Sequence, residues 1–451
     1  MKLATFMLDD PDNPPEHPPT MPLSGFVYFA QFALHDLSFD RTPLVIARCI
    51  PPENRVNHRS PFLDLDSVYG EGPEGSPQLY YLPKNRRGQL LPPGNERLLL
   101  DKTPGGELID LPRTGAGRPV LGDLRNEENL ILAQLHAVIL RFHNRMMDLV
   151  DSGVATEPRL ARLSTFEQAR QLAVWHYQYV LIHDLLPQFV DNTIFDETIA
   201  NYRSLSACPN NGCIPVEFAL AAFRFGHSLV RNNYIIKPGS HPRESLSTLL
   251  NLNSMGNPPM LKLQDEWVIE WGRFFNIQPF GDRNMAHSLD THIALALHSL
   301  PGPVPIDCAS PPHTTRSLPA VTLLRGARSG LPSGQRVADA LGAPRLTEAD
   351  LVWQDPANPD LGEFLSRNNF LTETPLWYYI LQEAAIKGNR QRLGPVGSRI
   401  VAETIVGLLA ADPNSVLNRG TGWNPPSWSW KTPPVQINDM ETLVQFALDL
   451  P

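Results

Sequence analysis

Apolar residues recur at helical spacing along much of this chain. In the longest run they occupy one face of a helix with 3.6 residues per turn, at Leu130, Ile131, Leu135, Val138, Ile139, Phe142 and Met146. Comparable patterns predict helices over residues 127–151, 165–190, 216–230, 285–300, 374–386 and 395–411. Strand-like alternation of apolar and polar residues is scarce. The sequence therefore predicts a mainly α fold with long irregular connections.

The chain has 45 prolines, which cluster at residues 11–22, 73–119, 301–312 and 425–434. Because proline lacks an amide hydrogen and breaks helices, these clusters predict loops. We interpret them as ordinary loops that interrupt the helices, and the alternative is that they form the wall of a substrate channel. No glycine–serine linker, charge run or repeat divides the chain. We therefore expect one large domain at 25–451 after an N-terminal extension at 1–24, with two lobes as the alternative.

Charge and composition exclude several classes of protein. The net charge of −9 and the pI near 5.8 give no basic footprint for nucleic acid. No apolar run is long enough to span a membrane, and the N-terminus MKLATFMLDDPDNPP lacks a signal-peptide core. We expect a soluble, cytoplasmic protein, unless a leader has been removed. The oligomeric state stays open.

Four cysteines are too few for a disulfide framework in a chain of this length, namely Cys49, Cys208, Cys213 and Cys308. Cys208 and Cys213 are close enough in sequence to close a small loop. Two such ligands without nearby partners make a poor zinc site. We expect reduced thiols.

Three segments carry candidate chemistry. Arg125 directly precedes the long apolar run, and Asn126, Glu127 and Glu128 after it are residue types that favour a helix N-terminus. The other two segments, QFALHDLSFD at 31–40 and AFRFGHSLVRNN at 222–233, each place one histidine among apolar residues. Taken singly, such a histidine is usually a packed core residue and such an arginine is usually solvated.

Taken together and in order, these segments resemble the animal-type haem peroxidases, a superfamily that includes cyclooxygenases and fatty-acid α-dioxygenases. The distal motif is matched by Gln31, His35 and Asp36, and the Gly-Asp-x-Arg motif by Gly122, Asp123 and Arg125. The helix after it ends in His143, Asn144 and Arg145, and the proximal motif is matched by Phe223, Arg224, Gly226 and His227. Further matches are Arg325, Gly326, Gly330, Leu331 and Pro332, then PLWYYILQEA at 375–384 and LGPVGSRIVAETIVGLL at 393–409. The compact chain most resembles bacterial members of the family.

The resemblance implies a haem b cofactor and a peroxidase reaction. His227 would be the axial ligand of the haem iron, and His35 the base that moves the proton of hydrogen peroxide. Arg125 would stabilise the charge that develops as the oxygen–oxygen bond breaks. Arg224 and Arg325 would pair with the haem propionates. The expected activity is reduction of hydrogen peroxide and oxidation of a small donor through a ferryl haem.

The sequence leaves the reducing substrate open among phenols, halides and specialised metabolites. Gln31 matches a distal glutamine associated with halide access, and the same amide could instead order water in the pocket. A part in the response to oxidative stress would fit a peroxidase.

A second group of residues resembles the calcium site of the family. Ser60, Phe62, Asp64 and Asp66 are spaced by two, so their side chains share one side of an extended loop. With Asp36 they would supply hydroxyl, carbonyl and carboxylate oxygens, which are the ligands that calcium requires. The alternative is an exposed acidic turn. Because Asp36 adjoins His35, a bound ion would fix the distal histidine.

Departures from the family pattern limit how haem is attached. Leu34 stands where relatives carry an ester-forming aspartate, and Asn129 where they carry a sulfonium-forming methionine. One ester, through Glu128, remains open; the simpler role of its neighbour Glu127 is helix capping. Thr322 replaces the asparagine that accepts a hydrogen bond from the axial imidazole. We therefore expect weaker imidazolate character on His227, or a substitute acceptor.

Arg224 also bears on the reaction type, because fatty-acid oxygenases of the family carry a radical-forming tyrosine at this place. We interpret the tyrosines at 177, 179, 202 and 234 as packed amphipathic residues. A peroxidase is the leading hypothesis, and an oxygenase that uses another tyrosine is the second. A haem-binding or adhesion module without turnover is the third, although retention of His35, Arg125 and His227 argues against it.

Overall fold

The computed structural model describes residues 1–9, 20–51, 54–205, 214–277, 281–352, 358–419, 423–431 and 434–450. Cys49 and Cys308 are free and exposed, as the sequence predicts. Cys208 and Cys213 lie outside the described residues. Among the described helices, none is both long and apolar enough to cross a membrane.

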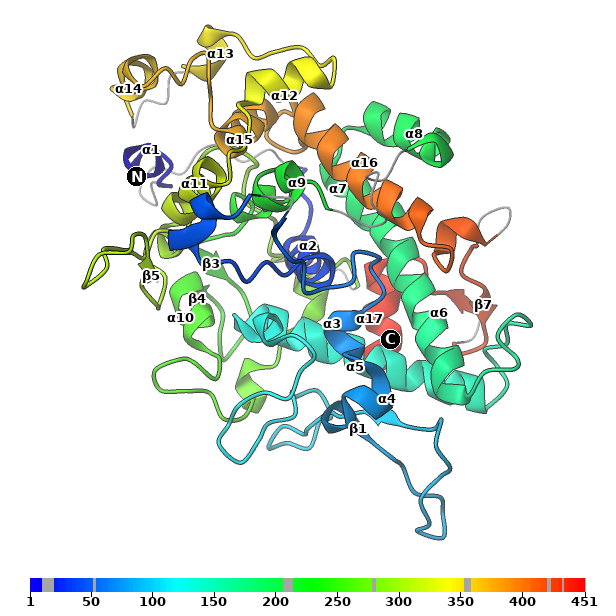
Figure 1. Cartoon of the computed structure of the whole chain (residues 1–451). Coiled ribbons are helices and arrows are strands. Elements are labelled where there is room, and N and C mark those ends of the chain that lie inside the picture. Colours follow the sequence, from blue (N-terminus) through cyan, green and yellow to red (C-terminus); the bar gives the residue numbers. More distant parts are fainter. Residues whose placement is uncertain are drawn as a thin grey trace.

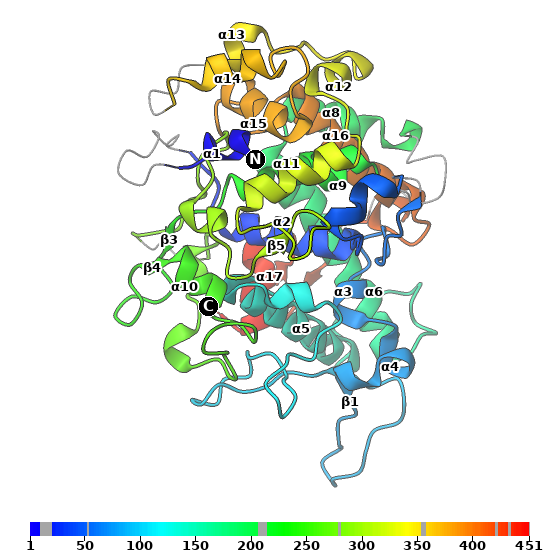
Figure 2. The ribbon, with the colours of Figure 1, turned by 60° about the vertical axis from the view of Figure 1, so that its left-hand side comes forward.

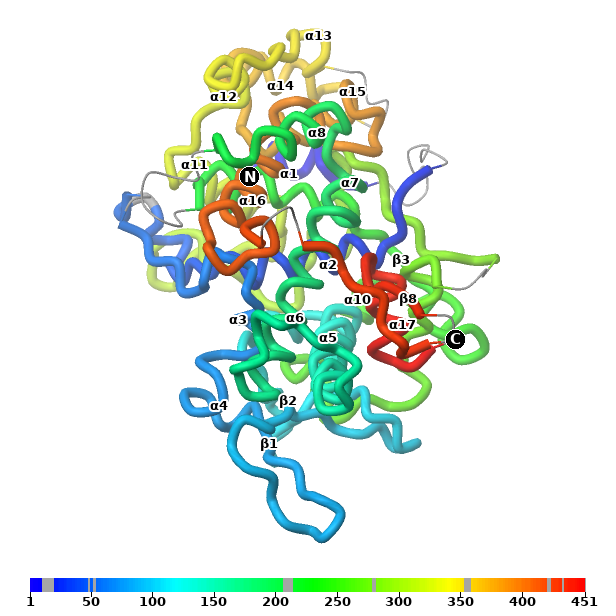
Figure 3. The backbone as a smooth tube through the Cα atoms, turned by 90° about the vertical axis from the view of Figure 1, so that its right-hand side faces the viewer, coloured from blue at the N-terminus to red at the C-terminus, as the bar shows by residue number. Residues whose placement is uncertain are grey.

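Helix α2 (Gly25–Leu37) runs through the centre of the molecule, and the longer helices pack around it (Figure 1). These longer helices are α5 (Leu130–Asp151), α6 (Thr165–Val180), α15 (Leu376–Lys387), α16 (Pro395–Ala411) and α17 (Met440–Leu448). Helix α5 packs against α2, α6 and α17, and α16 packs against α15 and α8 (Asn192–Ala200) (Figure 3). The predicted mainly α fold is confirmed.

The other described α-helices are α1 (Lys2–Thr5), α3 (Asp66–Tyr69), α4 (Gly72–Gly75), α7 (Leu186–Phe189), α9 (Val216–Leu220), α10 (Leu246–Asn251), α11 (Leu318–Arg328), α12 (Gly334–Ala340), α13 (Glu348–Leu351) and α14 (Leu361–Arg367). The 3₁₀ turns are η1 (Leu44–Cys49), η3 (Pro77–Leu79), η4 (Leu124–Glu127), η6 (Tyr202–Ser204), η7 (Ala222–His227), η8 (Asp265–Trp267), η9 (Trp271–Arg273), η10 (Leu295–His298) and η11 (Val416–Asn418).

Strands are confined, in the described parts of the chain, to antiparallel pairs of two residues each. The pairs are β1 (Tyr80–Tyr81) with β2 (Arg97–Leu98), β3 (Asn233–Tyr234) with β4 (Glu244–Ser245), β5 (Val304–Pro305) with β6 (Thr314–Thr315), and β7 (Ser427–Trp428) with β8 (Val435–Gln436). The loop between β1 and β2 projects from one end of the molecule (Figure 2).

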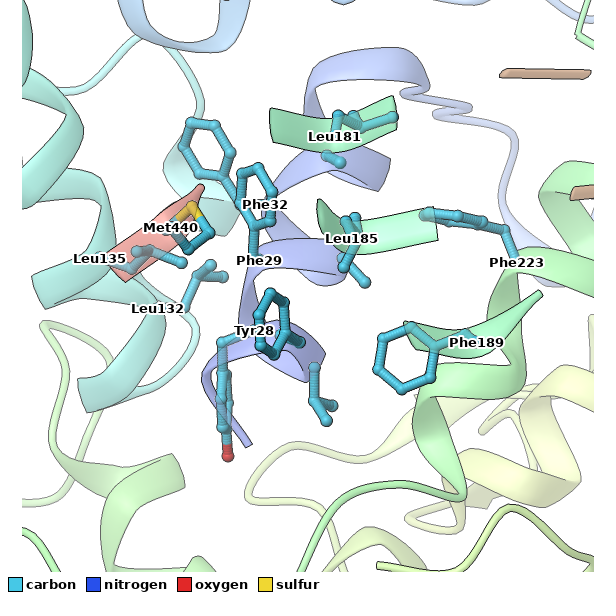
Figure 4. Packing of buried hydrophobic residues seen from close by; sticks show 14 of the residues in the cluster. Tyr28, Phe29, Phe32, Leu132, Leu135, Leu181, Leu185, Phe189, Phe223 and Met440 are labelled. Carbon is cyan, nitrogen blue, oxygen red and sulfur yellow. The ribbon is translucent and has the colours of Figure 1, made fainter. Parts of the chain in front are cut away.

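The buried face of α2 forms the middle of the hydrophobic core. Phe29 and Phe32 of α2 lie among residues of α5, the turn after α6, α7 and α17 (Figure 4). Phe29 and Phe32 are both fully buried, and each makes an edge contact with the ring of Tyr177 on α6. Full burial of a phenylalanine side chain contributes about 1.5–3 kcal/mol, so this contact region holds α2 firmly between α5 and α6.

Local sequence explains where the two longest helices begin. The Asn129 side chain accepts a hydrogen bond from the amide of Leu132 and so caps α5. Ser164 and Glu167 form a reciprocal capping box at the start of α6. Helix α6 continues through a π turn (Leu181–Leu185) into α7, where Pro187 cannot donate a helical hydrogen bond. The predicted helix at 165–190 is thus confirmed with one irregular turn.

The predicted helix at 216–230 is wrong as a continuous element. Ala221 adopts a non-helical backbone conformation (φ −135°, ψ −70°) between α9 and η7. The break lets the rings of Phe218 and Phe223 stack with centroids 4.8 Å apart, which a regular helix at a spacing of five residues does not allow. His227 therefore lies at the end of a short 3₁₀ turn rather than in a long helix.

The predicted helix at 285–300 is also wrong, apart from the 3₁₀ turn η10. Its first half is extended, with an antiparallel bridge between Met285 and Leu23 and a parallel bridge between Ile293 and Leu8. The backbone hydrogen bonds that a helix would make within itself go instead to distant segments. Tertiary contacts override the helical periodicity here.

The N-terminal residues pack onto the core. Leu3 and Met7 are buried, and α1 contacts α11. Residues 1–9 therefore lie against the rest of the molecule. The boundary at residue 24 stays a prediction.

Candidate active site

One cavity of about 1100 Å³ brings together most of the predicted site residues. Its walls come from α2, η4 and the start of α5, the η7 turn and α11. It exceeds the roughly 300–1,000 Å³ typical of small-molecule sites. The predicted residues that line it are Gln31, His35, Arg125, Glu128, Arg224, His227 and Arg325. Thr322 and the predicted calcium ligands lie elsewhere in the fold.

His35 is oriented by a buried amide. Its Nδ1 lies 2.9 Å from the Oδ1 of Asn126, and the Nδ2 of Asn126 donates to the Nδ1 of His136 at 3.0 Å. With the amide in this orientation, His35 carries its hydrogen on Nδ1 and keeps a lone pair on Nε2. Burial and the nearby Arg125 lower the pKa of His35 to about 3, so the imidazole is neutral. A neutral imidazole with a free Nε2 can accept a proton.

Arg125 is held rigidly by the protein. Its Nε and NH2 donate to Asp123, its NH1 to the Ser38 carbonyl at 2.8 Å, and its NH2 also to the His35 carbonyl at 2.9 Å. The guanidinium also lies 4.2 Å from the ring centroid of Phe39. Four of its five N–H groups therefore have protein partners, which leaves one NH1 hydrogen for a bound molecule. Arg125 thus acts chiefly as a fixed positive charge beside the cavity.

The two glutamates after Arg125 have different partners. Glu128 lies in the cavity, where Gln31 Nε2 donates to its Oε2 at 3.2 Å and His35 Nε2 is 3.9 Å away. Desolvation raises the pKa of Glu128 to about 7, although Arg125 opposes the shift. Its side chain is half exposed, but to the space of the cavity that it lines. The carboxyl group is therefore placed to meet a molecule bound there.

Glu127 does not cap a helix, which corrects the sequence interpretation. It pairs with Arg113 and accepts a hydrogen bond from the Ser254 amide at 3.1 Å. The capping residue is Asn129, and the neighbouring Asn126 is fully buried rather than at a helix end. The reason is that η4 precedes α5 and turns these side chains inward before the helix begins.

His227 also lines the cavity, and its buried Nδ1 has no hydrogen-bond partner among the described residues. Its ring contacts the ring of Trp377 edge-on at 5.9 Å, and Trp377 donates to the Arg224 carbonyl at 3.1 Å. Burial and Arg224 lower the pKa of His227 to about 3, which keeps the imidazole neutral. The Thr322 hydroxyl is buried and also unpartnered, so it does not accept a hydrogen bond from His227. No other described residue replaces it as the acceptor.

A group of arginines gives the cavity a positive wall. Arg224 donates through Nε to the Ala219 carbonyl, and burial followed by Arg325 lowers its pKa to about 10. Arg325 donates to the Thr42 carbonyl at 3.1 Å. Charged side chains beside a cavity without an equal number of carboxylates favour an anionic ligand group. The arrangement therefore fits the carboxylates of a haem, while a neutral His227 fits its iron.

The predicted calcium residues include an acidic group formed by Asp36 near the end of α2 and by Asp64 and Asp66. Asp36 accepts hydrogen bonds from the Ser67 hydroxyl at 2.7 Å and the Leu65 amide at 3.1 Å. Burial, and then Asp66 and Asp64, raise the pKa of Asp36 to about 8. The Oδ1 atoms of Asp64 and Asp66 are buried without partners, which fits a cation.

The loop that carries Ser60 and Phe62 is anchored by hydrogen bonds, but the described residues form no recognisable cluster of metal ligands. Ser60 donates its amide to Asp66 at 2.9 Å, and the Phe62 carbonyl accepts from Gln178 at 3.2 Å, so the loop is anchored on both sides. Across the described ranges, however, no three His, Cys, Asp or Glu side chains are grouped as a metal centre. Calcium therefore stays a prediction.

Sequence reasoning missed several residues of the cavity. Tyr28 precedes Gln31 by three positions on α2, lines the same cavity and has a buried hydroxyl that interacts with Tyr234. Arg55 and Asp40 add a further charge pair, 3.8 Å apart. For Tyr28 the helical spacing from Gln31 and His35 was a usable signal. No local signal marks Arg55, because only the fold brings its loop to the cavity.

The mouth of the cavity is apolar. Three of its lining residues are strongly exposed: Val56 at 61%, Leu124 at 65% and Met255 at 89%. Pro119 and Pro301 also line it, so two of the four proline-rich regions contribute to the wall of the cavity. Exposed apolar side chains that line one cavity favour a binding region over chance exposure.

A sequence model of animal haem peroxidases matches residues 13–413 of the chain. The chorion peroxidase of Drosophila melanogaster is 24% identical over 379 residues, which cover 80% of this chain and 42% of the fly protein. Human myeloperoxidase is 30% identical over 193 residues, which cover 40% of this chain and 24% of that protein. The chain therefore spans less than half the length of these curated relatives.

Solved structures show the same fold. Peroxidase A from Dictyostelium discoideum aligns with a TM-score of 0.59 at 16% identity, over 92% of this chain and 83% of that one. The fatty acid α-dioxygenase of Arabidopsis thaliana aligns with a TM-score of 0.62 at 14% identity, over 99% of this chain and 72% of that one. At these identities the likeness concerns the fold alone.

Proposed function

The chain belongs to the animal haem peroxidase family, and on this premise we propose that it is a haem-dependent peroxidase that reduces hydrogen peroxide and oxidises a small organic donor. The observation that carries the proposal is the shared cavity. The cavity is lined by a neutral His227, whose Nδ1 has no hydrogen-bond partner in the described part of the chain. It is also lined by a neutral His35 and by Arg125, which hydrogen bonds hold in place. An iron ligand, a base and a positive charge are the groups that heterolytic cleavage of a peroxide requires.

A haem bound in this cavity would supply the iron that binds peroxide and accepts the oxidising equivalents. His227 would hold the iron through Nε2, since its Nδ1 is the buried nitrogen. Arg224 and Arg325 would pair with the haem carboxylates. Glu128 is the residue placed for a single covalent ester, because Leu34 and Asn129 carry no group that could form one.

His35 would take the proton of hydrogen peroxide on Nε2 and return it to the departing oxygen. Asn126 keeps the other ring nitrogen protonated, so the acceptor always faces the same way. Arg125 would lower the energy of the negative charge on the departing oxygen, and Asp123 holds it in place at 2.7 Å. Gln31 keeps Glu128 hydrogen-bonded beside the base.

The apolar mouth supports an organic donor rather than a halide. Val56, Leu124 and Met255 would favour a phenol or another apolar molecule through burial of its surface. Met255→Glu should therefore raise the KM for an apolar phenol several-fold and leave iodide oxidation unchanged. Leu261→Glu is the matched control, because Leu261 is 61% exposed and lies outside the cavity. An equal effect of both variants would refute an apolar entry route.

One observation supports a second function, a fatty-acid oxygenase. Among the described residues that line the cavity, Tyr28 is the one tyrosine, and its buried hydroxyl interacts with Tyr234. Regiospecific oxygen uptake with polyunsaturated fatty acids that is lost in Tyr28→Phe would favour this function. We place it second because Arg224 occupies the position of the family's radical tyrosine.

The main proposal is tested by variants of the three groups in haem-loaded protein. His35→Ala should slow the reaction with hydrogen peroxide by about 10²–10⁴, and Arg125→Ala by about 10²–10³, with haem content retained. His227→Ala should lose the histidine-ligated haem spectrum. His313→Ala is the control, because that imidazole is 77% exposed and does not line the cavity. An unchanged peroxide rate in His35→Ala would refute the proposal and favour a haem-binding module without turnover.

A further inference from the structure

Residues 284–293, which we call the strap, form no helix and carry isolated β-bridges at Met285 and Ile293. Asn284, Ser288, Leu289, Asp290 and Ile293 are each no more than 1% exposed. Buried backbone groups must find partners, and those of the strap include Arg273, Arg390 and three further segments of the chain. The strap therefore ties together parts of the molecule that are far apart in sequence.

The first of these segments leads into α2. The Ala286 amide donates to the Pro22 carbonyl at 2.7 Å, and the Ser24 amide donates to the Asn284 carbonyl at 2.7 Å. Ser24 directly precedes α2, the helix that carries Gln31 and His35. The strap thus fixes the start of the distal helix.

The second segment follows His227. The Ser228 hydroxyl donates to the Asp290 carbonyl at 2.7 Å and accepts from the Asp290 amide at 3.0 Å. The His287 amide donates to the Leu229 carbonyl at 2.9 Å. The Ser228 hydroxyl is fully buried and both donates to and accepts from Asp290. These bonds restrict the backbone of Ser228 and therefore that of the adjacent His227.

The third segment is the N-terminal arm, residues 1–9. The Ile293 amide donates to the Met7 carbonyl at 2.8 Å, and the Asp9 amide donates back to the Ile293 carbonyl at 3.0 Å. The Asp9 carboxylate lies 3.5 Å from His287 Nε2 and accepts from Asn232 at 2.6 Å. Asp290, His292 and Arg231 are the other charged or titratable groups around this contact.

We propose that the strap positions His227 against the helix that carries His35, with Ser228 as the positioning residue and the contact between Asp9 and His287 as its anchor. The inference rests on the proposed function, because it takes His227 as the ligand of haem iron. His227 has no hydrogen bond at Nδ1 and ends a short 3₁₀ turn. Side-chain partners that usually orient an axial histidine are absent among the described residues. Its orientation therefore comes from the backbone, which Ser228 fixes to the strap.

The first experiment measures the iron–histidine bond in haem-loaded Ser228→Ala, Ser228→Thr and Ser398→Ala. Ser398 is the matched control, because its fully buried hydroxyl also donates to a carbonyl, of Leu393, and accepts from an amide, of Asp191. We expect Ser228→Ala to shift the iron–histidine Raman band and to speed haem dissociation on the order of tenfold. Ser228→Thr should restore both. An unchanged band in Ser228→Ala, or an equal shift in Ser398→Ala, would overturn the proposal.

The second experiment tests the anchor and does not depend on haem. Hydrogen exchange of the Ile293 and His287 amides is compared between wild type and Asp9→Ala, with and without haem. We expect exchange on the order of tenfold faster in Asp9→Ala in both forms. Equal exchange in the two proteins would remove Asp9 as the anchor.

Failure of the strap and failure of the haem assignment give different results. If His227→Ala kept the iron–histidine band, the assignment of the ligand would be wrong, although the exchange experiment would still measure the strap. If His227→Ala lost the band while Ser228→Ala kept it unshifted, the haem assignment would hold and the strap would not position the ligand.

Discussion

Replacement of Asn126 by leucine tests how the distal base is set. Asn126 is fully buried, accepts from His35 Nδ1 at 2.9 Å and donates to His136 Nδ1 at 3.0 Å. Leucine has a similar size but no polar atom. Asn126→Leu therefore leaves two buried imidazole nitrogens without partners, and each costs about 1–3 kcal/mol. The expected loss is about 2–6 kcal/mol in the free energy of unfolding, a large part of the 5–15 kcal/mol typical of a folded domain.

The catalytic effect should exceed what the loss of stability explains. Without Asn126 the hydrogen of His35 is free to move to Nε2, which removes the lone pair from the cavity side. A wrong histidine tautomer with intact geometry costs on the order of 10⁴ in rate in serine proteases, and general-base catalysis as a whole contributes about 10²–10⁴. We expect the haem-loaded variant to react with hydrogen peroxide about 10²–10⁴ times more slowly.

Stopped-flow absorbance of the haem measures that rate, and denaturant unfolding measures the stability. Gln134→Leu is the control, because the buried Gln134 amide also bridges two groups, the Trp267 carbonyl at 2.9 Å and the Ile269 amide at 3.0 Å. It should lose comparable stability and keep the peroxide rate. If Asn126→Leu reacted as fast as Gln134→Leu, the tautomer of His35 would not depend on Asn126 and the reasoning would be wrong.

Three further predictions concern attachment, metal and pH. Mass analysis of peptides after acid extraction should find haem linked to Glu128 or to no residue, and Glu128→Gln should release all of it; haem linked elsewhere would show a wrong assignment. Chelation or Asp64→Ala should slow the peroxide reaction more than it lowers haem content, since movement of a catalytic group by about 1 Å costs on the order of a hundredfold; equal rates with and without the metal would exclude calcium from the reaction. Although burial opposes both shifts, the contact with Asp9 holds the pKa of His287 above its ordinary value, and His287 holds that of Asp9 below its own. The pair therefore stabilises the fold fully between pH 3.8 and 6.5, and its contribution is lost as pH rises through the raised pKa of His287 or falls through the lowered pKa of Asp9; a difference in unfolding free energy between wild type and Asp9→Asn that did not shrink above neutral pH would contradict this.

The sequence by itself determined the long helices with clear apolar periodicity. Helices α5, α6, α15 and α16 follow from apolar periodicity, whereas the caps Asn129 and Ser164 emerged only from the structure. It also identified the family, because the order of the motifs around His35, Arg125 and His227 is itself a property of the sequence. In the folded protein those three residues line one cavity.

Only the tertiary structure decided the orientation of the site. Asn126 and Glu127 read as helix-capping residues, yet their partners are His35, His136 and Arg113, which lie 10 or more positions away. No local pattern contains such pairs. A polar side chain before a helix satisfies the same sequence rule whether it caps the helix or turns inward to a distant imidazole.

The strap shows the same limit for the backbone. Residues 285–293 have helical periodicity, but their amides and carbonyls bond to Met7, Pro22 and Leu229. Helix formation needs each amide to find a carbonyl four residues back, whereas burial needs only that every amide finds some partner. Periodicity reports the first condition. The second depends on which distant segments the fold places beside the buried chain. The sequence therefore determined which side chains belong to the candidate site, while tertiary contacts determined that His35 and His227 line one cavity.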